Sequence, residues 1–401
     1  MKKTGAWLAR YALEQLPIRY TFGIPGVHNT ELYDELNSSK IIDPILVTHE
    51  GGAAFMADAI SRVSDNIGCL LIVPAAGVTH AASGIGEAFL DGIPMLVISG
   101  GIRSDSQYGY QLHEIDQHAL LKPITKNVYK IQAHSEIVST IFEAYALAID
   151  GEPGPVFVEI PVNIQLDRGE IGSLPKFVAL KQHYTVDDFE IEKAIALLSA
   201  AQCPGIFVGW GAVSASENIQ KIAEFIAAPV ATTLQGLSSF PANHPLHVGF
   251  GIGPAAVPAA RNAFADCDCL LAIGTRFGEI ATGSFGINVP ENLIHIDINP
   301  EVFNRNYTAK VTLQGDAKAV TSALLSKLVI STTKCDSQMI EEKIAVDKAA
   351  FAKEWLAHDS GDKVNPIEFF NELRLQLDDD AILVVDDGNH TFLTAELMPI
   401  Y

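Results

Sequence analysis

Short apolar runs that alternate with helix-like stretches constrain the fold of this chain more than any other feature. The runs Leu70–Val73 and Met95–Ile98 are apolar throughout, and Val156–Ile160 is apolar except for Glu159, which is typical of strands buried on both faces of a parallel sheet. Alternation of such strands with helices predicts a doubly wound α/β domain over residues 1–166. The helix-like stretches of this segment are Thr4–Leu13, Gly52–Arg62 and Ile137–Ile149.

A second segment of the same kind spans residues 189–333, where we expect a central α/β domain. Its strand-like runs end at small or polar residues, which is where open α/β sheets place their ligand crevices. No G-x-G-x-x-G motif lies between a strand and a helix here, so a dinucleotide site and a plain spacer domain both stay open. The runs are Ile206–Gly211, Val230–Thr233, Leu270–Gly274 and Leu293–Ile298.

The remaining segments predict two linkers and the beginning of a third unit. The polar stretch 167–188 and the charged, helical stretch 334–364 are the expected linkers. In residues 365–401 we expect a helix over Pro366–Leu377 and a strand over Ala381–Val385. One helix and one strand cannot form an α/β layer and would leave an unpaired strand edge. The chain, long enough for two or three domains, is therefore expected to stop inside a third one.

Net charge and cysteine usage narrow the class of protein. A net charge of −21 disfavours binding to nucleic acid or to anionic membranes, because both attract Lys and Arg. The apolar run Ile67–Val78 is too short to span a bilayer and contains Pro74. Five scattered cysteines predict reduced, buried thiols in a cytoplasmic protein rather than disulfides or a zinc site.

Glu50 is the charged residue that the local sequence singles out. It follows an apolar stretch and begins a segment rich in Gly and Ala, Gly51–Ala59. Small neighbours would let a flat ligand pack closely against the carboxylate. The alternative is an acid that only interacts with the positive end of a helix dipole. Glu50 is therefore a candidate catalytic carboxylate, and the adjacent His49 is expected to be structural.

An ordered series of phrases around Glu50 resembles a known family. The series resembles the pyrimidine-binding domain of thiamine diphosphate (ThDP) enzymes of the acetolactate synthase and 2-oxo acid decarboxylase family, and the resemblance continues to about Phe392. It implies consecutive Rossmann-like domains of the ThDP-binding fold with a nucleotide-binding-like central domain. The phrases are Thr21–Asn29, Leu46–Ala59, Gly77–His80, Glu87–Gly100, His113–Gln117 and Pro123–Lys126.

The resemblance implies roles for residues of the first domain. Glu50 would hydrogen-bond the aminopyrimidine ring of ThDP and take part in general acid–base catalysis through the cofactor. His28 and His113 would reach the substrate, with surface-loop histidines as the alternative. Ordinary turns are the alternative for the implied cofactor contacts. Those contacts are Gly23, Pro25, Gly26, Gly77 and His80.

The stretch Asp386–His390 resembles the opening of the family's diphosphate-binding domain. It implies that Gly388, Asn389 and His390 contact the cofactor's phosphates, with a capped strand-to-helix turn as the alternative. The family's Mg²⁺ motif, Gly-Asp-Gly followed by Asn, does not occur in this sequence. We therefore expect no metal ligand in this chain, Mg²⁺ ligands in a missing part of the domain, and an inactive truncated chain.

Departures from the family pattern bear on the cofactors. Ala75–His80 stands where relatives have Gly-Pro-Gly-Ala-Thr-Asn, so a histidine replaces the Asn. Glu152 stands where acetohydroxyacid synthases place an Arg for FAD, and Pro161-Val162-Asn163 replaces their Pro-Lys-Asp. A carboxylate beside a pyrophosphate is unfavourable, so FAD stays open but disfavoured. Lys126 matches a family landmark and is expected to be a solvated charge.

Three functions stay open at this point. The first is a ThDP-dependent carboligase of the acetolactate synthase type, acting on a 2-oxo acid. The second is a ThDP-dependent 2-oxo acid decarboxylase that releases an aldehyde, which the phrases Gly26–His28 and Leu112–Glu114 favour. The third is a catalytically silent fragment that binds a partner subunit. For either enzyme the resemblance implies a homodimer or a dimer of dimers, because the two ends of the cofactor contact different subunits.

Overall fold

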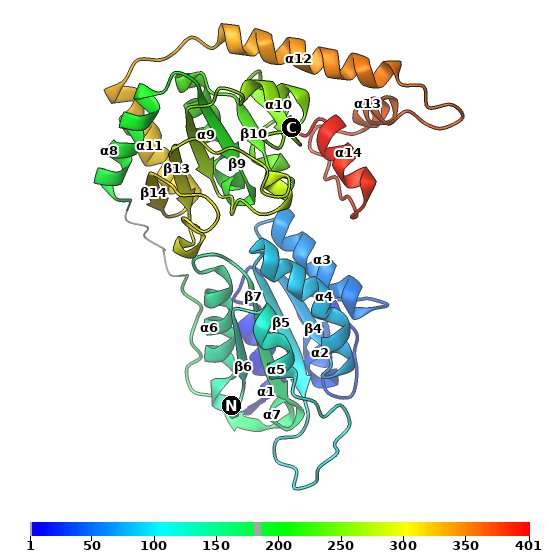
Figure 1. Ribbon diagram of the computed structural model, residues 1–401. Helices are drawn as coiled ribbons and strands as arrows, with labels where there is room; N and C mark the ends of the chain where they lie inside the picture. The colour runs from blue at the N-terminus through cyan, green and yellow to red at the C-terminus, as the bar shows by residue number, and fades with distance from the viewer. Residues whose placement is uncertain (1, 180–185) are drawn as a thin grey trace. The chain divides into compact units, whose positions relative to one another are not determined.

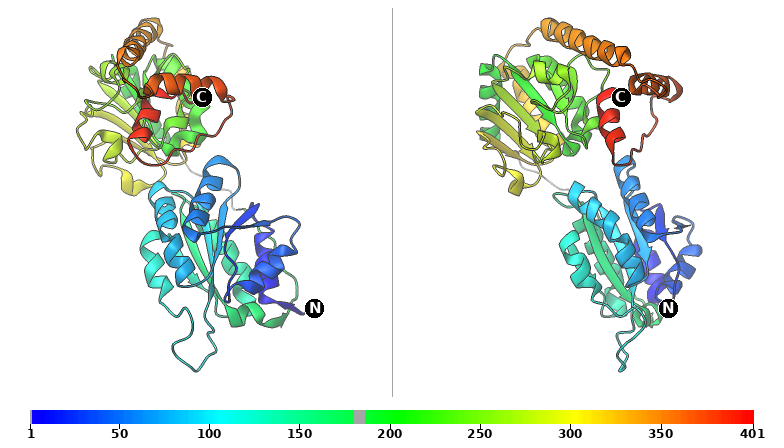
Figure 2. Two further views of the ribbon diagram at one scale, coloured as in Figure 1. Left: turned by 90° about the vertical axis from the view of Figure 1, so that its right-hand side faces the viewer. Right: turned by 45° about the vertical axis from the view of Figure 1, so that its right-hand side comes forward.

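The computed structural model describes residues 2–179 and 186–401 and divides into two compact units, residues 1–182 and 183–401 (Figure 1). Each unit contains a six-stranded parallel sheet with helices on both of its faces (Figures 1 and 2). The α/β fold class predicted from the sequence is therefore confirmed. Residues 180–185 of the expected linker 167–188 lie outside the described residues.

The central strands of the first unit are buried along their whole length. The sheet consists, in spatial order, of β3 (Asp43–Leu46), β2 (Tyr20–Gly23), β4 (Gly68–Ile72), β5 (Met95–Gly101), β7 (Pro155–Pro161) and β6 (Asn127–Lys130), all parallel. Every residue of β4, β5 and β7 is buried. Strands covered on both faces need apolar side chains at successive positions, which is why these three could be predicted.

Helices cover both faces of this sheet. One face carries α1 (Gly5–Leu13), α2 (Thr30–Asn37), α6 (Ile137–Ile149) and α7 (Val162–Leu166). The other carries α3 (Glu50–Val63), α4 (Ala76–Asp91) and the short α5 (Gln117–Leu121). A Cβ atom at Gly84 would lie 2.6 Å from the Cβ of Ala54, so small residues let α3 and α4 approach closely. The Gly- and Ala-rich sequence after Glu50 therefore has a packing reason.

The first residues of the expected polar linker belong to the first unit. Strand β8 (Arg168–Glu170) pairs antiparallel with β1 (Lys2–Thr4) at the start of the chain. The amide of Gly5 also donates to the carbonyl of Asp167 at 3.0 Å. Strand pairing gives the backbone groups of both short segments a partner, so residues 168–170 form a strand rather than a linker.

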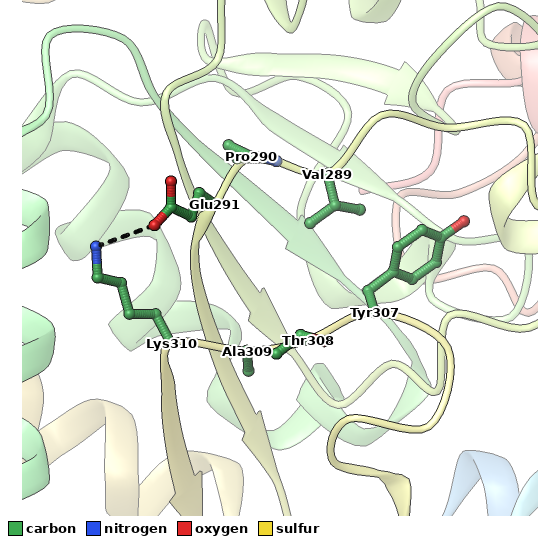
Figure 3. A pocket seen from close by; sticks show the side chains of 7 residues that line it. All are labelled: Val289, Pro290, Glu291, Tyr307, Thr308, Ala309 and Lys310. Atoms are coloured by element: carbon green, nitrogen blue, oxygen red, sulfur yellow. Dashed lines mark ion pairs between the residues drawn. The ribbon is translucent and has the colours of Figure 1, made fainter.

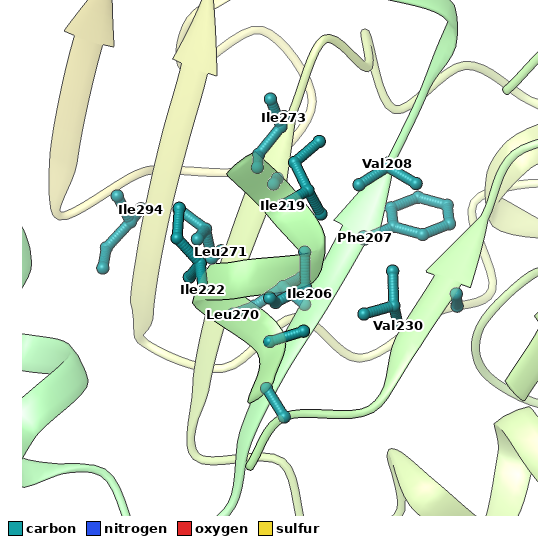
Figure 4. Packing of buried hydrophobic residues seen from close by; sticks show 14 of the residues in the cluster. Ile206, Phe207, Val208, Ile219, Ile222, Val230, Leu270, Leu271, Ile273 and Ile294 are labelled. Atoms are coloured by element: carbon teal, nitrogen blue, oxygen red, sulfur yellow. The ribbon is translucent and has the colours of Figure 1, made fainter. Parts of the chain in front are cut away.

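The second unit repeats the architecture. Its sheet consists, in spatial order, of β11 (His247–Phe250), β10 (Val230–Thr232), β9 (Pro204–Val208), β12 (Cys269–Ile273), β13 (Asn292–Asp297) and β14 (Val311–Gln314), all parallel. The core of this unit is one buried hydrophobic cluster that includes Phe207 of β9, Leu271 of β12, Ile219 and Ile222 (Figure 4). The helices beside the sheet are α8 (Asp188–Ala200), α9 (Ser216–Ile226), α10 (Pro258–Ala263) and α11 (Ala317–Ser331).

Three further helices of the second unit follow α11: α12 (Gln338–Ala357), α13 (Pro366–Gln376) and α14 (Asn389–Leu397) (Figure 1). The predicted helices in the charged stretch 334–364 and over Pro366–Leu377 are thus present as α12 and α13. Only Ile344 of α12 is buried, and it joins the core of the second unit. A helix with one buried residue and many charges matches its polar sequence.

The predicted strand over Ala381–Val385 was wrong. These residues form no regular structure, and Ile382 and Val384 are 64% and 83% exposed. A strand requires a neighbour to complete its hydrogen-bond ladder, and within the described ranges 2–179 and 186–401 no strand pairs with this segment. An apolar run alone cannot supply that neighbour.

The cysteines are only partly as expected. All five are free thiols, but Cys203 and Cys335 are exposed, whereas Cys69 and Cys269 are buried. The expectation of buried thiols therefore fails for two of them. Among the residues that the structure describes, no helix has both the length and the apolar content needed to cross a bilayer.

Candidate active site

The carboxyl ends of β2 and β4 form the topological switch point of the first sheet. The chain leaves β2 toward β3 on one side and leaves β4 toward β5 on the other. Open α/β sheets bind their ligands outside the carboxyl ends of strands at such a point. The loop after β2 carries Gly23–His28, the loop after β4 leads into Gly77–His80, and Glu50 follows the neighbouring β3. The tertiary structure therefore gathers these predicted site residues at one edge of the sheet.

Glu50 is the first residue of α3 and is only 7% exposed. His49 caps this helix, because its Nδ1 accepts a hydrogen bond from the amide of Gly51 at 3.0 Å. The structural role expected of His49 is thus observed. The helix dipole stabilises a carboxylate at the first turn, so the fold itself can hold a negative charge in this buried position.

The two oxygens of the Glu50 carboxylate have different surroundings. Oε2 lies 3.1 Å from Nδ1 of His80, whose ring stacks on that of His49 with centroids 4.7 Å apart. Oε1 faces Gly77, where a Cβ atom would lie 3.6 Å away. No residue of the described ranges forms a hydrogen bond with Oε1. One oxygen is thus held by the protein, and the other is available to a ligand beside a residue without a side chain.

The loop after β2 is held by a residue that the sequence reasoning missed. Oδ1 of the buried Asn29 accepts from the amide of Gly26 at 2.7 Å, and its Nδ2 donates to the carbonyl of Ile24 at 3.2 Å. Pro25 lies exposed between these two contacts. The side chain of an Asn immediately before a helix often forms hydrogen bonds with nearby backbone groups. The position of Asn29 before α2 could therefore have predicted this role.

The predicted glycines of the two loops pack against neighbouring strands and loops. A Cβ atom at Gly23 would lie 2.0 Å from the carbonyl oxygen of Leu71, so only glycine fits between β2 and β4. A Cβ atom at Gly26 would lie 2.7 Å from Cγ1 of Val73, and one at Gly77 would lie 3.0 Å from Cγ2 of the same side chain. The two loops therefore meet across Val73, beside Glu50.

His28 and His113, the predicted substrate residues, lie together. Their Nδ1 atoms are 3.4 Å apart and their ring centroids 5.2 Å apart. His28 is buried, and burial lowers its pKa, an effect that the neighbouring His113 increases. His113 adopts a left-handed backbone conformation with φ of 66° in the loop after β5. The backbone carbonyl of His28 accepts a hydrogen bond from Nε2 of the buried Gln165 at 2.8 Å, a support that no sequence pattern marked.

Lys126 is not the solvated charge that we expected. Its ammonium group donates to the carbonyls of Leu147, Asp150 and Glu152 at 2.6, 2.5 and 2.8 Å. These carbonyls belong to the end of α6 and the turn after it. Unpaired carbonyls at a helix C-terminus attract cations, so Lys126 has a structural role.

The predicted phosphate contacts lie in the second unit. Gly388 precedes α14 with φ of 153°, a conformation that favours glycine, and Asn389 and His390 form the first exposed residues of the helix. The hydroxyl of Thr391 donates to the carbonyl of Asp386 at 2.5 Å and closes the turn. The N-cap residue Gly388 makes no side-chain capping hydrogen bond, and the amides at such a helix start can donate to a phosphate.

The sheet of the second unit has its own switch point, between β9 and β12. Gly209 and Gly211 after β9 meet Gly274 after β12, and a Cβ atom at Gly209 would lie 2.2 Å from the carbonyl oxygen of Gly274. The amide of Gly211 donates to that carbonyl at 3.2 Å. The two loops are therefore packed backbone to backbone at the place where a dinucleotide would have to approach.

A pocket of about 390 Å³ lies elsewhere in the second unit, at the amino ends of β13 and β14 (Figure 3). Lys310 and Glu291 face each other across part of its rim at 4.0 Å, and Tyr307 closes another side. Ligands of open α/β sheets bind at the opposite, carboxyl edge. The pocket therefore lies at the edge of the second sheet that is opposite its switch point. In residues 2–179 and 186–401 no group of three His, Cys, Asp or Glu side chains is placed to hold a metal ion.

Comparisons with known proteins assign a family domain to each of the two units. Residues 2–120 match the model of the thiamine pyrophosphate enzyme N-terminal TPP binding domain, and residues 191–324 match that of the thiamine pyrophosphate enzyme central domain. Both matches fall within the two α/β units, one in each.

Several curated relatives are acetolactate synthase large subunits. The chain is 34% identical to a probable acetolactate synthase large subunit of Methanocaldococcus jannaschii, over 82% of this chain and 57% of the relative. It is 31% identical to the acetolactate synthase large subunit of Corynebacterium glutamicum, over 99% of this chain and 64% of the relative. It is 30% identical to the acetolactate synthase isozyme 2 large subunit of Escherichia coli, over 98% of this chain and 70% of the relative. The chain thus spans between about half and two thirds of the length of the first two relatives.

Proposed function

This chain belongs to the acetolactate synthase large-subunit family of thiamine pyrophosphate enzymes, and on that premise we propose that it serves a ThDP-dependent reaction of 2-oxo acids. The reaction is decarboxylation of a pyruvate-type substrate followed by carboligation, as in an acetolactate synthase. The observation that carries the proposal is the buried Glu50 carboxylate at the switch point, with Oε1 open to a ligand.

The residues of the first unit fit the pyrimidine half of ThDP. Oε1 of Glu50 has no hydrogen-bond partner among residues 2–179 and 186–401, and Gly77 beside it leaves the space that a flat ring needs. Bound ThDP supplies a carbon nucleophile for attack on the 2-oxo group. Oε1 of Glu50 would hold and transfer a proton at a ring nitrogen of the cofactor. His80 would keep the carboxylate oriented through Oε2, and Gly23, Pro25 and Gly26 would border the same site.

His28 and His113 would serve the substrate. Two imidazoles with facing Nδ1 atoms share a hydrogen bond, so one donates and the other accepts. Their Nε2 atoms are left to orient a carboxylate or carbonyl oxygen. Gly388, Asn389 and His390 would contact the diphosphate, and Mg²⁺ would accompany that group, both on the strength of the family resemblance.

We do not extend the proposal to FAD. Glu152 stands where the family's flavin-binding members have an Arg, and its backbone carbonyl is used to hold Lys126. The close packing of Gly209 against Gly274 also occupies the carboxyl edge of the second sheet. Both observations count against a flavin in this chain.

A homodimer or a dimer of dimers is the assembly we propose. Large apolar side chains on α3 and α4 are exposed, which is typical of a protein interface. Phe55 and Met56 of α3 are 48% and 47% exposed, and Leu90 of α4 is 64% exposed. Helix α3 begins at Glu50, and α4 begins at Ala76, one residue before Gly77. A partner subunit that covers these helices would therefore lie near the site around Glu50. A cytoplasmic location is the further proposal that five free thiols support.

A 2-oxo acid decarboxylase that releases an aldehyde is the second candidate. The His28–His113 pair favours it, because paired imidazoles can deliver the proton that ends such a reaction without carboligation. Product analysis with pyruvate separates the candidates. Acetolactate supports the first, and free acetaldehyde supports the second.

Glu50→Gln tests the proposed function in the full-length protein. The amide keeps the size of the side chain but cannot transfer the proton, so deuterium exchange at C2 of bound ThDP should slow by about 10²- to 10⁴-fold. Exchange is followed by proton NMR after acid quench. Asp34→Asn, a change at an exposed carboxylate of α2, is the control. Exchange at the wild-type rate in Glu50→Gln, with ThDP bound, would remove Glu50 from the mechanism.

A further inference from the structure

A buried carboxylate outside the proposed site interrupts the apolar strand β7. Glu159 is 3% exposed, and its Oε2 accepts hydrogen bonds from Nε2 of Gln117 at 2.7 Å and from Nε2 of His118 at 2.8 Å. Its Oε1 lies 3.1 Å from the ammonium group of Lys130 on β6. A buried charge is stable only when it is paired and hydrogen-bonded, and these three partners provide both.

The two ends of one loop meet at this carboxylate. Strand β5 ends at Gly101, where a Cβ atom would lie 2.5 Å from Oε1 of Glu159. Gln117 and His118, the first residues of α5, are two of its hydrogen-bond donors. Residues 102–116 therefore form a loop whose start touches one oxygen of Glu159 and whose end bonds the other.

That loop carries His113 to His28. His113 and Tyr110 both adopt positive φ, at 66° and 58°, which β-carbon-bearing residues keep only when their surroundings enforce it. Tyr108 and Tyr110 are 85% and 103% exposed, so the tip of the loop gains little from burial. Near its start, the amide of Ser104 donates to Oδ1 of Asn163 at 2.9 Å. At its end, Oδ1 of Asp116 accepts from the amide of Ala119 at 2.9 Å, and the next two residues, Gln117 and His118, donate to Glu159.

We propose that Glu159 is the positioning residue that anchors residues 102–116 and so holds His113 against His28. The anchor itself follows from the contacts of the first unit alone; its consequence for catalysis rests on the proposed role of the two histidines. Glu159 does not touch the substrate in this proposal. It acts through α5, whose first turn fixes the end of the loop three residues beyond His113.

Limited proteolysis of the full chain tests the anchor without cofactor or substrate. In Glu159→Gln the charge that pairs with Lys130 and His118 is lost, so chymotrypsin should cleave after Tyr108 and Tyr110 at least about tenfold faster, because local opening becomes more frequent. Gln117→Met removes one donor without touching the buried charge and should raise the same cleavage by a smaller factor. Glu143→Gln, at an exposed carboxylate that accepts a hydrogen bond from Tyr129, is the matched control.

The outcomes separate the anchor from the proposed function. Faster cleavage at the two tyrosines, with an unchanged urea midpoint for the second unit, supports the anchor. Wild-type cleavage in both variants overturns it, even if one of them folds poorly. In the active enzyme the anchor further requires KM for the 2-oxo acid to rise while the affinity for ThDP stays unchanged. If the wild-type protein turns over no 2-oxo acid, the proposed function fails and the proteolysis result still decides the anchor.

Discussion

Ala75 shows how a single residue departs from the conformation that its side chain prefers. It stands at the turn from β4 into α4 with φ of 58° and ψ of −95°. A Cβ atom makes positive φ unfavourable by about 1–2 kcal/mol, whereas glycine adopts it freely. The family to which the chain is similar has glycine here, beside the loop that faces Glu50. The turn therefore stores strain next to the proposed site.

Ala75→Gly should stabilise the first unit by about 0.5–1 kcal/mol, since relief of the strain exceeds the extra flexibility of glycine in the unfolded chain. The change is measured by urea unfolding. Ala76→Gly, one residue on at the first position of α4, should instead destabilise by about 0.5–1 kcal/mol because its backbone is helical. Equal effects of the two substitutions would show that the turn at Ala75 is not strained.

At the scale of the element, two charged side chains each hold one end of a helix. Lys126 supplies donors to three carbonyls at the end of α6, and Glu159 supplies acceptors to the start of α5. Both are distant in sequence from the helix they contact: Lys126 directly precedes β6, and Glu159 lies on β7. The carbonyls that Lys126 contacts need such a donor, because the last carbonyls of a helix have no partner within it, whereas Glu159 holds α5 through the side chains of Gln117 and His118.

Lys126→Met should destabilise the first unit by about 2 kcal/mol, the loss expected when a charged donor leaves buried carbonyls unpaired. Burial lowers the pKa of Lys126, against the opposing charges of Asp150 and Glu152, so part of the gain from its hydrogen bonds is already offset by desolvation. Thermal unfolding by circular dichroism measures the change. Lys122→Met, an exposed lysine four residues earlier, is the control and should change stability by less than about 0.5 kcal/mol.

Glu159 should also make the stability of the first unit depend on pH. Burial raises the pKa of Glu159. Hydrogen bonds from His118 and Gln117 and the charge of Lys130 together lower this pKa by more than burial raises it, so the pKa lies below the ordinary value of 4.5. A carboxyl whose pKa is lowered in the folded state contributes stability above its unfolded pKa and loses it as the pH falls through the folded one. The stability difference between the wild type and Glu159→Gln should therefore be largest at neutral pH and shrink below about pH 4.5. Urea unfolding across this range measures it; a difference that grows on acidification would contradict the assignment.

At the scale of the whole molecule, the exposed apolar face of α3 and α4 is the main surface still to be explained. Its residues include Phe55, Met56 and Leu90, and α3 begins at Glu50. We propose that a second copy of the protein covers it. The double substitution Phe55→Glu and Leu90→Glu should then convert the dimer into a monomer in sedimentation velocity, because two charges on each partner oppose burial.

The matched control places the same charges on another exposed apolar pair. Val329 and Ile330 at the end of α11 are 52% and 86% exposed, and their replacement by Glu should leave the dimer intact. A wild-type protein that sediments as a monomer at all concentrations would make the homodimer wrong. Loss of the dimer in both double variants would point to a general effect of charge.

The order of strands and helices was predictable wherever burial imposed a pattern. β4, β5 and β7 appeared as apolar runs because both of their faces are covered, and α6 appeared over the bounds that it has. The strand expected over 381–385 is absent because the prediction rested on an apolar run, whereas a strand also needs a neighbouring strand for its hydrogen bonds. Glu159 is visible in the sequence as a single carboxylate inside the otherwise apolar run Val156–Ile160, but the run does not predict which residues pair with it.

Sequence by itself determined that the chain forms successive α/β units. It also identified Glu50 and the loops Gly23–His28 and Gly77–His80 as candidates for one site. These conclusions depend on local composition and on order along the chain. Tertiary structure alone decided that His80 holds one oxygen of Glu50, that His28 meets His113, and that Glu159 ties α5 to β7. Each of these contacts joins residues 30 to 85 positions apart. Only the pairing order of the strands, which brings distant loops to one edge of a sheet, sets such distances.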